Sequence, residues 1–368
     1  MAAEGPTFAV LGTGNAGQTF AADIALKGFS VNLAEVPQFA NSLHAIKSKG
    51  GIEINGEAGS GFARFNMYTT DIAKAVKGVD IIIIGGSAFA HEPISKALID
   101  KFEDGQFVLF TSNFSALRFH QWMIEAGAKT HVTPVESASL LYATRAVAPG
   151  VVSCLGVKSH LPVAALPARR TKEFIAKISP VFPQFEAADN VLFTSINNMN
   201  PIVHPPMVLF NAGRIESMEG HAWNLYADGA TESVVKIMLA MDKERMALLD
   251  LLGIQGITFK DTFKYFYQDY TLEGNSLSEI LRRSPIHSDP AMPAPSVVKT
   301  RYIEEDLPFG LTAWSSMGRQ WGLAMPNIDT VIQIASVMLD TAFYKDGITP
   351  DKLGINGLSP EETVALVS

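Results

Sequence analysis

The sequence predicts an α/β chain with two domains, the first built on a parallel β-sheet and the second made of helices. Over residues 1–188, short apolar runs alternate with helical segments, an order typical of parallel sheets with right-handed crossovers. A glycine-rich turn joins the first apolar run to the first helical segment. Over residues 189–368, long helical patterns follow one another and strand signals nearly vanish. We therefore expect the domain boundary near Asp189.

The first domain opens on a strand, a turn and a helix. Residues 8–11 are apolar, and the turn Gly12-Thr13-Gly14-Asn15-Ala16-Gly17 leads from them into a helical segment that Gly28 ends. In a G-x-G-x-x-G turn the first glycine permits the tight turn, the second lets backbone approach a pyrophosphate, and the third lets helix and strand pack closely. Amides at a helix start also favour phosphate. The turn, with Gly12, Gly14, Asn15, Ala16 and Gly17 as contacts, predicts a dinucleotide site.

A carboxylate in the right place extends this prediction. The second apolar run, residues 29–34, ends in Glu35, close to where dinucleotide-binding folds place the acid that binds the adenosine ribose. No Arg or Lys between Val36 and Leu43 is available to neutralise a 2′-phosphate, so NAD is favoured over NADP as the cofactor. The alternative is a glycine-rich turn that happens to precede a surface glutamate.

The remaining strands should carry further cofactor contacts, because ligands of such sheets lie beyond the carboxyl ends of the strands. Ser87 and Asn113 are predicted cofactor contacts, and Glu136 is predicted beside the nicotinamide; a turn or capping role is the alternative for each. The expected elements are a hairpin or loop over 52–65, a helix over 72–76 capped by Thr70-Asp71, strands over 80–84, 107–111 and 130–135, and helices over 91–100 and 117–126. Pro93 suits a first helical turn, and residues 151–187 should complete the sheet. Helices are expected over about 195–216, 229–252, 257–268, 275–282 and 326–344.

Composition limits the possible partners. The formal charge of −8 argues against a nucleic-acid partner, which would favour a basic face. The single cysteine, Cys154, excludes an internal disulfide and fits a reducing compartment. No secretory signal or membrane-spanning stretch is expected, so the cytoplasm is the predicted location, without membrane association. No metal is expected. The apolar helical domain favours a homodimer.

Among the eight histidines, His204 has a distinctive setting. It lies in Asn197-Asn198-Met199-Asn200-Pro201-Ile202-Val203-His204-Pro205-Pro206, where prolines distort a helix and free backbone groups. A hydride-transfer site needs such a proton donor or acceptor, although a structural histidine is the alternative. His91, at the ligand edge of the sheet, is a candidate to support the residues that contact the ligand. The other histidines are interpreted as surface or packing residues: His44, His120, His131, His160, His221 and His287.

Several motifs occur along the chain: the glycine turn, Asn200-Pro-Ile-Val-His204-Pro, Asn211-Ala-Gly-Arg214-Ile-Glu216, Thr300-Arg301-Tyr302-Ile303-Glu304-Glu305-Asp306 with Gly310-Leu311, and the tail Lys352-Leu353-Gly354-Ile355 with Gly357-Leu358. Together they resemble the opine dehydrogenase family, which includes octopine and nopaline dehydrogenases and bacterial N-(1-carboxyethyl)amino-acid dehydrogenases. The resemblance covers nearly the whole chain.

The resemblance implies a Rossmann domain and an all-helical substrate domain that reduce, with NADH, the imine formed between a 2-keto acid and the amine of an amino acid. By position, His204 matches the general acid/base, Asp306 its carboxylate partner, and Arg301 the arginine of the same constellation. Arg301 is also a candidate ligand for a carboxylate, either that of the keto acid or that of Asp306 itself, and Asn198 and Asn200 either orient the keto acid or cap the helix.

Some features depart from this pattern or leave alternatives. Thr144-Arg145 stands where the bacterial members have Cys-Arg, so the resemblance does not carry substrate identity over. An aromatic stripe at helical spacing indicates core or subunit packing, or contact with the amino-acid side chain; it comprises Phe259, Phe263, Phe266, Tyr267 and Tyr270. The alternative enzymes are a ketopantoate reductase or a glycerol-3-phosphate dehydrogenase, which the absence of lysine between Asn190 and Arg214 disfavours. A non-catalytic NAD sensor is the other alternative.

Overall fold

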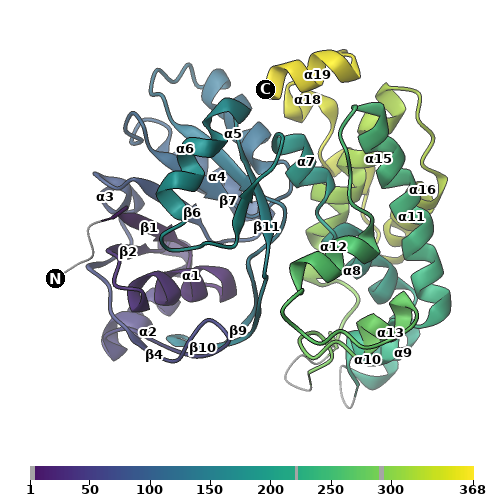
Figure 1. Cartoon of the computed structure of the whole chain (residues 1–368), viewed down its shortest axis with the longest axis horizontal. Helices are drawn as coiled ribbons and strands as arrows, with labels where there is room; N and C mark the ends of the chain where they lie inside the picture. Colours follow the sequence, from purple (N-terminus) through teal and green to yellow (C-terminus); the bar gives the residue numbers. More distant parts are fainter. Residues whose placement is uncertain (1–4, 220–222, 290–293) are drawn as a thin grey trace. The chain divides into compact units, whose positions relative to one another are not determined.

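The computed structural model describes residues 5–219, 223–289 and 294–368 (Figure 1). His221, which the sequence analysis interprets as a surface or packing residue, lies outside these residues. The chain divides into two compact units: residues 1–194 together with the last two residues, and residues 195–366. The division falls within a helix that begins at Val191, slightly beyond the expected boundary.

Unit 1 is built on an eight-stranded sheet with the order β12-β11-β8-β7-β6-β1-β2-β5. Its strands are β1 (Phe8–Leu11), β2 (Val31–Ala34), β5 (Met67–Thr69), β6 (Ile81–Ile84), β7 (Phe107–Phe110), β8 (Thr133–Ser137), β11 (Leu161–Ala165) and β12 (Phe185–Ala187). All neighbours are parallel except β11, which runs antiparallel to β8. The strand order reverses at β1, because β2 lies on one side of it and β6 on the other. Such a switch point opens a ligand crevice at the carboxyl ends of the strands.

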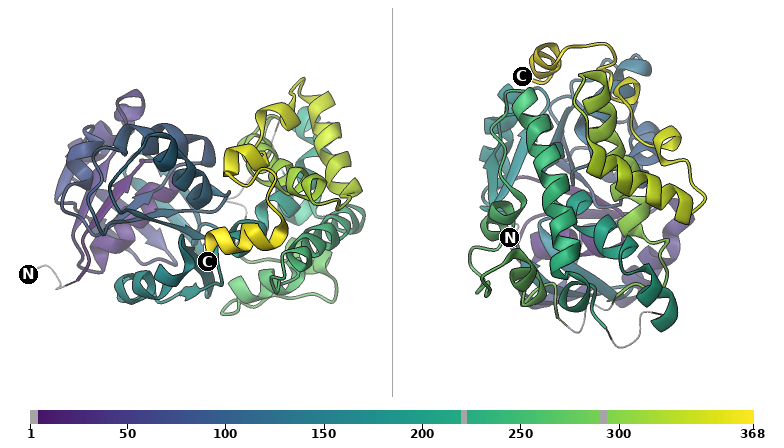
Figure 2. Two further views of the ribbon diagram at one scale, coloured as in Figure 1. Left: turned by 90° about the horizontal axis from the view of Figure 1, so that it is seen from above. Right: turned by 90° about the vertical axis from the view of Figure 1, so that its right-hand side faces the viewer.

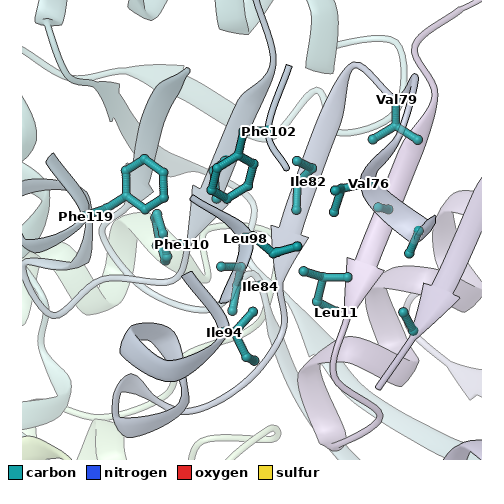
Figure 3. Packing of buried hydrophobic residues seen from close by; sticks show 14 of the residues in the cluster. Leu11, Val76, Val79, Ile82, Ile84, Ile94, Leu98, Phe102, Phe110 and Phe119 are labelled. Atoms are coloured by element: carbon teal, nitrogen blue, oxygen red, sulfur yellow. The ribbon is translucent and has the colours of Figure 1, made fainter. Parts of the chain in front are cut away.

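Helices cover both faces of this sheet, which explains its unbroken apolar strands. On one face, α3 (Ile72–Val76), α4 (Ala88–Leu98) and α5 (Ser115–Glu125) bury a cluster that includes Leu11, Ile82, Ile84, Leu98 and Phe119 (Figure 3). On the other face lie α1 (Asn15–Leu26) and α6 (Thr171–Ile178), and the Phe174 ring of α6 lies 5.4 Å from the Phe107 ring of β7.

A second, four-stranded sheet was not expected. Its order is β4-β3-β10-β9, formed by β3 (Ile52–Gly56), β4 (Gly61–Ala63), β9 (Tyr142–Ala148) and β10 (Val151–Val157). The prediction that residues 151–187 complete the main sheet is therefore wrong for β10 and correct for β11 and β12. The second sheet packs on α1, where Gln18 Oε1 accepts a hydrogen bond from the Gly150 amide at 2.8 Å. It thereby supports the helix that follows the glycine turn.

Some predicted elements are confirmed because a local feature of the sequence specifies them. Asp71 caps α3 by accepting a hydrogen bond from the Lys74 amide at 3.1 Å, and the hairpin expected over 52–65 is β3 and β4. The placement of Pro93 is wrong, because α4 begins at Ala88 and holds the proline in its interior. The strand expected over 130–135 begins only at Thr133.

Unit 2 is helical (Figure 2). Its longest helix, α11 (Glu232–Leu251), lies beside α16 (Pro326–Met338), and both pack against α8 (Asn200–Leu209). The single helix expected over 195–216 is wrong: prolines and turns divide this stretch into α7 (Val191–Ile196), α8 and α9 (Ala212–Met218). The other helices are α10 (Leu225–Gly229), α12 (Phe259–Phe266), α13 (Leu277–Arg282), α14 (Arg301–Glu304), α15 (Thr312–Gln320), α17 (Phe343–Asp346), α18 (Pro350–Leu353) and α19 (Pro360–Val367). A π-helical segment, η3 (Leu307–Leu311), precedes α15, and short 3-10 turns, η1 (Pro37–Phe39) and η2 (Ala168–Arg170), lie in unit 1.

A buried ion pair fixes the chain just before α8. Arg245 is fully buried and bonds Asp242 Oδ1 through Nε and Nη2, at 2.8 and 2.7 Å. Its Nη1 donates to Asn197 Oδ1 at 2.8 Å, and Nη2 donates to the carbonyl of Ile257. Such a fully bonded guanidinium holds three segments in one geometry. The start of the histidine-bearing helix is therefore anchored to α11.

Candidate active site

The glycine turn has the close packing that its residue types require. Gly12 adopts φ +107°, a conformation that favours glycine. A Cβ on Gly17 would overlap the carbonyl oxygen of Gly12, and a Cβ on Gly85 would lie 2.6 Å from the Gly17 Cα. Gly14 differs, since a Cβ there would meet nothing within 4 Å. The turn thus packs tightly against β6 while its second glycine faces open space, as a phosphate-binding backbone would.

Glu35 lies directly over this turn. Its Oε2 accepts hydrogen bonds from the Thr13 amide at 2.6 Å and the Thr13 hydroxyl at 2.8 Å, and its Oε1 accepts one from the Val36 amide at 2.9 Å. The carboxylate is mostly buried, 6% exposed. These donors hold a charged acceptor at the carboxyl end of β2, and Oε1, which accepts one hydrogen bond, has a further lone pair for a ribose hydroxyl.

Asn15, another predicted cofactor residue, has a structural contact as well. Asn15 Oδ1 accepts a hydrogen bond from the Ala146 amide of β9 at 2.9 Å, which ties the start of α1 to the second sheet. Ala16, the next residue of α1, is half-buried. Contact between these residues and a nucleotide stays a prediction.

Ser87 and Asn113 follow β6 and β7, and Glu136 is the penultimate residue of β8, so all three lie at the expected edge of the sheet, but they differ in exposure. Ser87 is half-buried at the start of α4, and Asn113 is buried with φ +71°. Glu136 is fully buried: its Oε2 accepts from the Ala116 amide at 3.1 Å and its Oε1 from the Thr194 hydroxyl at 3.2 Å. Glu136 therefore caps α5 and fixes α7, and its nicotinamide contact stays a prediction.

His91 has an internal role at the same edge. It is fully buried, its Nδ1 lies 2.7 Å from the Ser115 hydroxyl, and its Nε2 lies 3.1 Å from the carbonyl of Gly86. Burial, with a smaller contribution from the Arg118 charge, lowers the pKa of His91 to about 3. A neutral His91 thus links the loop after β6 to α5.

In unit 2, His204 and Asp306 form the central pair. His204 Nδ1 lies 2.7 Å from Asp306 Oδ2, and both side chains are largely buried. His204 lies on α8, while Asp306 lies between α14 and η3. An ionised carboxylate only accepts hydrogen bonds, so Nδ1 carries the proton and the neutral ring keeps its lone pair on Nε2. The pair has the arrangement of a general acid/base with an orienting carboxylate.

Two tyrosines complete the surroundings of the imidazole. The Tyr226 hydroxyl, on α10, lies 3.2 Å from His204 Nε2. The Tyr302 ring, on α14, lies 4.3 Å from the imidazole with the planes tilted by 39°. The ring of His287 lies 4.8 Å from that of Tyr226. Sequence reasoning did not identify the contacts of Tyr226 and Tyr302 with His204; Tyr302 lies inside a quoted motif, whereas no pattern marks Tyr226. The ring contact of His287 agrees with its interpretation as a surface or packing residue.

The other predicted substrate residues lie close to His204 or to Asp306 in the sequence. Arg301 is half-exposed, and its Nε lies 3.9 Å from Glu305 Oε2 rather than at Asp306. Its guanidinium has donors left for a ligand carboxylate. Asn198 is buried and its Oδ1 accepts from the Asn200 amide at 3.1 Å, which is a capping contact at the start of α8. Asn200 is half-buried.

A π-helical turn sets the position of Asp306 relative to α8. η3 begins at Leu307, directly after Asp306, and a Cβ on Gly310 would overlap the ring of Pro201, lying 2.9 Å from its Cβ. Single π-turns inside helices are frequent at functional sites. The close approach of Gly310 to Pro201 therefore keeps η3 against the helix that carries His204.

The departures noted in the sequence have structural explanations. The Thr144 hydroxyl lies 2.7 Å from that of Thr19 and bonds the Ser153 carbonyl at 3.1 Å, so it joins α1 to the second sheet. Phe259, Phe263, Phe266 and Tyr267 are buried, which supports core packing for most of the aromatic stripe.

Within the described residues, no cluster of His, Cys, Asp or Glu could hold a metal ion. No described helix has the length and apolar character to cross a membrane.

Comparison with known proteins identifies relatives of this chain. A family model described as NAD/NADP octopine/nopaline dehydrogenase, alpha-helical domain, matches residues 187–339. An opine dehydrogenase from Arthrobacter sp. (strain 1C) is 34% identical over 358 residues, which cover 97% of each chain. A vitopine synthase from Allorhizobium ampelinum is 24% identical, again with 97% of each chain covered.

A solved structure has the same fold along the whole chain. It is an octopine dehydrogenase in complex with NADH and agmatine, with a TM-score of 0.75 at 19% identity, covering 98% of each chain. The chain belongs to the opine dehydrogenase family.

Proposed function

We propose that this protein catalyses the NADH-dependent reductive condensation of a 2-keto acid, such as pyruvate, with the amine of an L-amino acid, and the reverse oxidation. The observation that carries the proposal is the buried His204–Asp306 pair in a chain of this family. The two substrates first form a carbinolamine, which loses water to give an imine. Reduction of the imine yields a secondary-amine dicarboxylate.

The chain's own residues supply the proton chemistry. Protonated His204 donates the proton that lets hydroxide leave the carbinolamine as water, and neutral His204 accepts a proton in the reverse reaction. Asp306 holds Nδ1–H at 2.7 Å, so it fixes the ring orientation and stabilises the imidazolium. Arg301 offers a planar pair of donors suited to the keto acid carboxylate. Asn198 and Asn200, which precede His204 in the sequence, are assigned to orient that substrate.

The residues around the glycine turn fit a dinucleotide. Gly14 leaves open space beside the first amides of α1, and Glu35 holds an anionic acceptor beside the turn. The pyrophosphate is assigned to Gly12, Gly14, Asn15, Ala16 and Gly17, and the adenosine ribose to Glu35. Ser87, Asn113 and Glu136 remain the candidates near the nicotinamide ribose and ring. NADH, when bound, supplies the hydride that reduces the imine.

The test is the oxidation of NADH by the purified protein with pyruvate, oxaloacetate or 2-oxoglutarate, each with and without a panel of amino acids. We expect oxidation to require both a keto acid and an amino acid. Oxidation with the keto acid alone would instead identify a reductase of the lactate or ketopantoate type. Absence of oxidation with NADH alongside oxidation with NADPH would contradict the assignment of Glu35.

We also infer a homodimer in the cytoplasm. The single cysteine supports a reducing compartment, and the apolar helices of unit 2 support self-association. Light scattering during size-exclusion chromatography gives the mass in solution, and a mass of one chain would exclude the dimer. Fluorescence of a tagged chain in cells tests the location.

A further inference from the structure

The Tyr226 hydroxyl contacts the imidazole nitrogen of His204 that must exchange a proton with the substrate. Asp306 engages Nδ1, so the proton that serves the substrate must pass through Nε2. The Tyr226 hydroxyl lies 3.2 Å from that atom. A phenolic hydroxyl both donates and accepts, so it can donate to neutral Nε2 and accept from protonated Nε2. The same contact therefore persists in both states of the histidine.

The Tyr226 ring is held where it is. The residue is mostly buried on α10, and its amide donates to Asn224 Oδ1 at 2.8 Å at the start of that helix. The imidazole of His204 lies edge-on to the ring, at 6.5 Å between centroids, and the ring of His287 lies against it. A ring packed by neighbours on two sides is costly to rotate away, since each contact would be lost. The Tyr226 hydroxyl is thus held in contact with His204 Nε2.

Resting on the proposed function, we propose that Tyr226 is a catalytic residue that relays the proton between His204 and the substrate. In the condensing direction, the Tyr226 O–H passes its proton to the hydroxyl oxygen of the carbinolamine while Nε2–H of the imidazolium returns a proton to the phenol oxygen. The C–O bond breaks as the nitrogen lone pair forms the C=N bond, and water leaves. The products are an iminium ion, water and neutral His204, so charge and atoms balance.

Several charged and titratable groups lie near the imidazole among the described residues. Asp306 faces Nδ1, and Tyr226 and Tyr302 face the ring from α10 and α14. The ring of His287 lies 4.8 Å from that of Tyr226, and Glu305 and Arg301 pair with each other beside Asp306. A pH profile of the reaction therefore reports on this whole set of groups.

The experiment measures kcat and KM for Tyr226→Phe with NADH, pyruvate and the amino acid that gives the highest rate in the panel above. Because positioned acid–base groups contribute roughly 10²–10⁴-fold, we expect kcat to fall about 10²-fold with little change in either KM. The control is Tyr344→Phe, which also removes a hydroxyl contact in unit 2, the 2.6 Å bond to Asp329 Oδ1. We expect its kcat to stay near that of the wild type.

A second measurement separates a relay from simple ring packing. The rate in mixtures of light and heavy water should curve with deuterium content in the wild type, because two protons move together, and should be linear in Tyr226→Phe. Replacing Tyr226 by 3,5-difluorotyrosine keeps the ring and makes the hydroxyl a stronger acid, so the alkaline limb of kcat should move to lower pH. This variant also serves if Tyr226→Phe fails to fold.

The outcomes are distinct. Wild-type kcat in Tyr226→Phe, an equal loss in Tyr344→Phe, a linear wild-type response to heavy water, or an unmoved alkaline limb would each overturn the relay. A wild-type protein that does not need an amine to oxidise NADH would instead overturn the proposed function.

Discussion

The imidazole Nδ1 of His204 lies 2.7 Å from the carboxylate of Asp306, although 102 residues separate the two in the chain. His204 lies on α8, and Asp306 is held by the junction of α14 with the π-turn η3. This contact fixes one tautomer and directs Nε2 towards the Tyr226 hydroxyl.

Loss of this pair should affect catalysis rather than cofactor binding. We expect His204→Ala to lower kcat by roughly 10²–10⁴-fold, because it removes the acid–base group. Asp306→Asn should also lower kcat strongly, since an amide neither stabilises the imidazolium nor fixes the tautomer. Steady-state kinetics and NADH fluorescence titration measure both properties. Unchanged turnover in His204→Ala would refute the assignment.

Glu35 should govern the affinity for NADH. Hydrogen bonds to charged groups contribute about 1.5–3 kcal/mol, so Glu35→Ala should weaken NADH roughly tenfold to a hundredfold and change KM for the keto acid little. The control is Glu53→Ala, which removes an exposed acid of β3 that pairs with Lys49. Equal weakening of NADH and the keto acid would remove Glu35 from the ribose.

Arg301 should act on the keto acid. Arg301→Lys keeps the charge but loses the planar pair of donors, so we expect KM for the keto acid to rise about tenfold while NADH affinity stays the same. Arg319→Lys is the matched control, because Arg319 is also half-exposed in unit 2 and pairs with Asp329 at 3.4 Å. A rise in KM in both variants would show a general effect of charge geometry on unit 2.

The contact between Gly310 and Pro201 should be sensitive to a single methyl group. Gly310→Ala forces a Cβ into the Pro201 ring, and overpacking of this kind costs about 1–3 kcal/mol of the free energy of unfolding. Because η3 follows Asp306 directly, kcat should fall as well. Gly213→Ala is the control: it lies in α9, where a Cβ meets nothing within 4 Å. Thermal unfolding and kcat, measured on both variants, check this; equal stability of the two would contradict the packing argument.

His91 should make unit 1 less stable in mild acid. Its pKa of about 3 in the folded chain lies below the ordinary value of 6.5, so the unfolded chain binds the proton more readily. The contribution of neutral His91 is complete above about pH 6.5 and is lost progressively as pH falls towards 3. Between pH 7 and pH 5 the loss is on the order of 2 kcal/mol.

Denaturant unfolding at pH 7 and pH 5 tests this prediction. His91→Asn removes the titrating group and should unfold with a smaller difference between the two pH values than the wild type. The variant should also be less stable at pH 7, because the contacts with Ser115 and Gly86 are lost. An identical pH difference in both proteins would show that other groups carry the acid sensitivity.

The sequence by itself determined the elements whose cause is local. The spacing of Gly12, Gly14 and Gly17 indicated a strand, a tight turn and a helix, because Gly12 adopts a positive φ and a Cβ on Gly17 would overlap the Gly12 carbonyl oxygen, both within a few residues. Asp71 specified the start of α3 through its own side chain. The order of strands and helices gave the class of fold. The family resemblance, not the spacing, paired His204 with Asp306.

Only the tertiary structure decided which distant groups meet. The sequence pattern of an apolar strand such as β10 is the same whether the strand joins the main sheet or pairs with β3 and β9. The reason is that the side-chain period of a strand does not depend on its partner. Tyr226 reaches His204 Nε2 only because α10 packs against α8. Such contacts depend on which helices, far apart in the sequence, pack together. The hydrophobic period of a helix does not identify its partner.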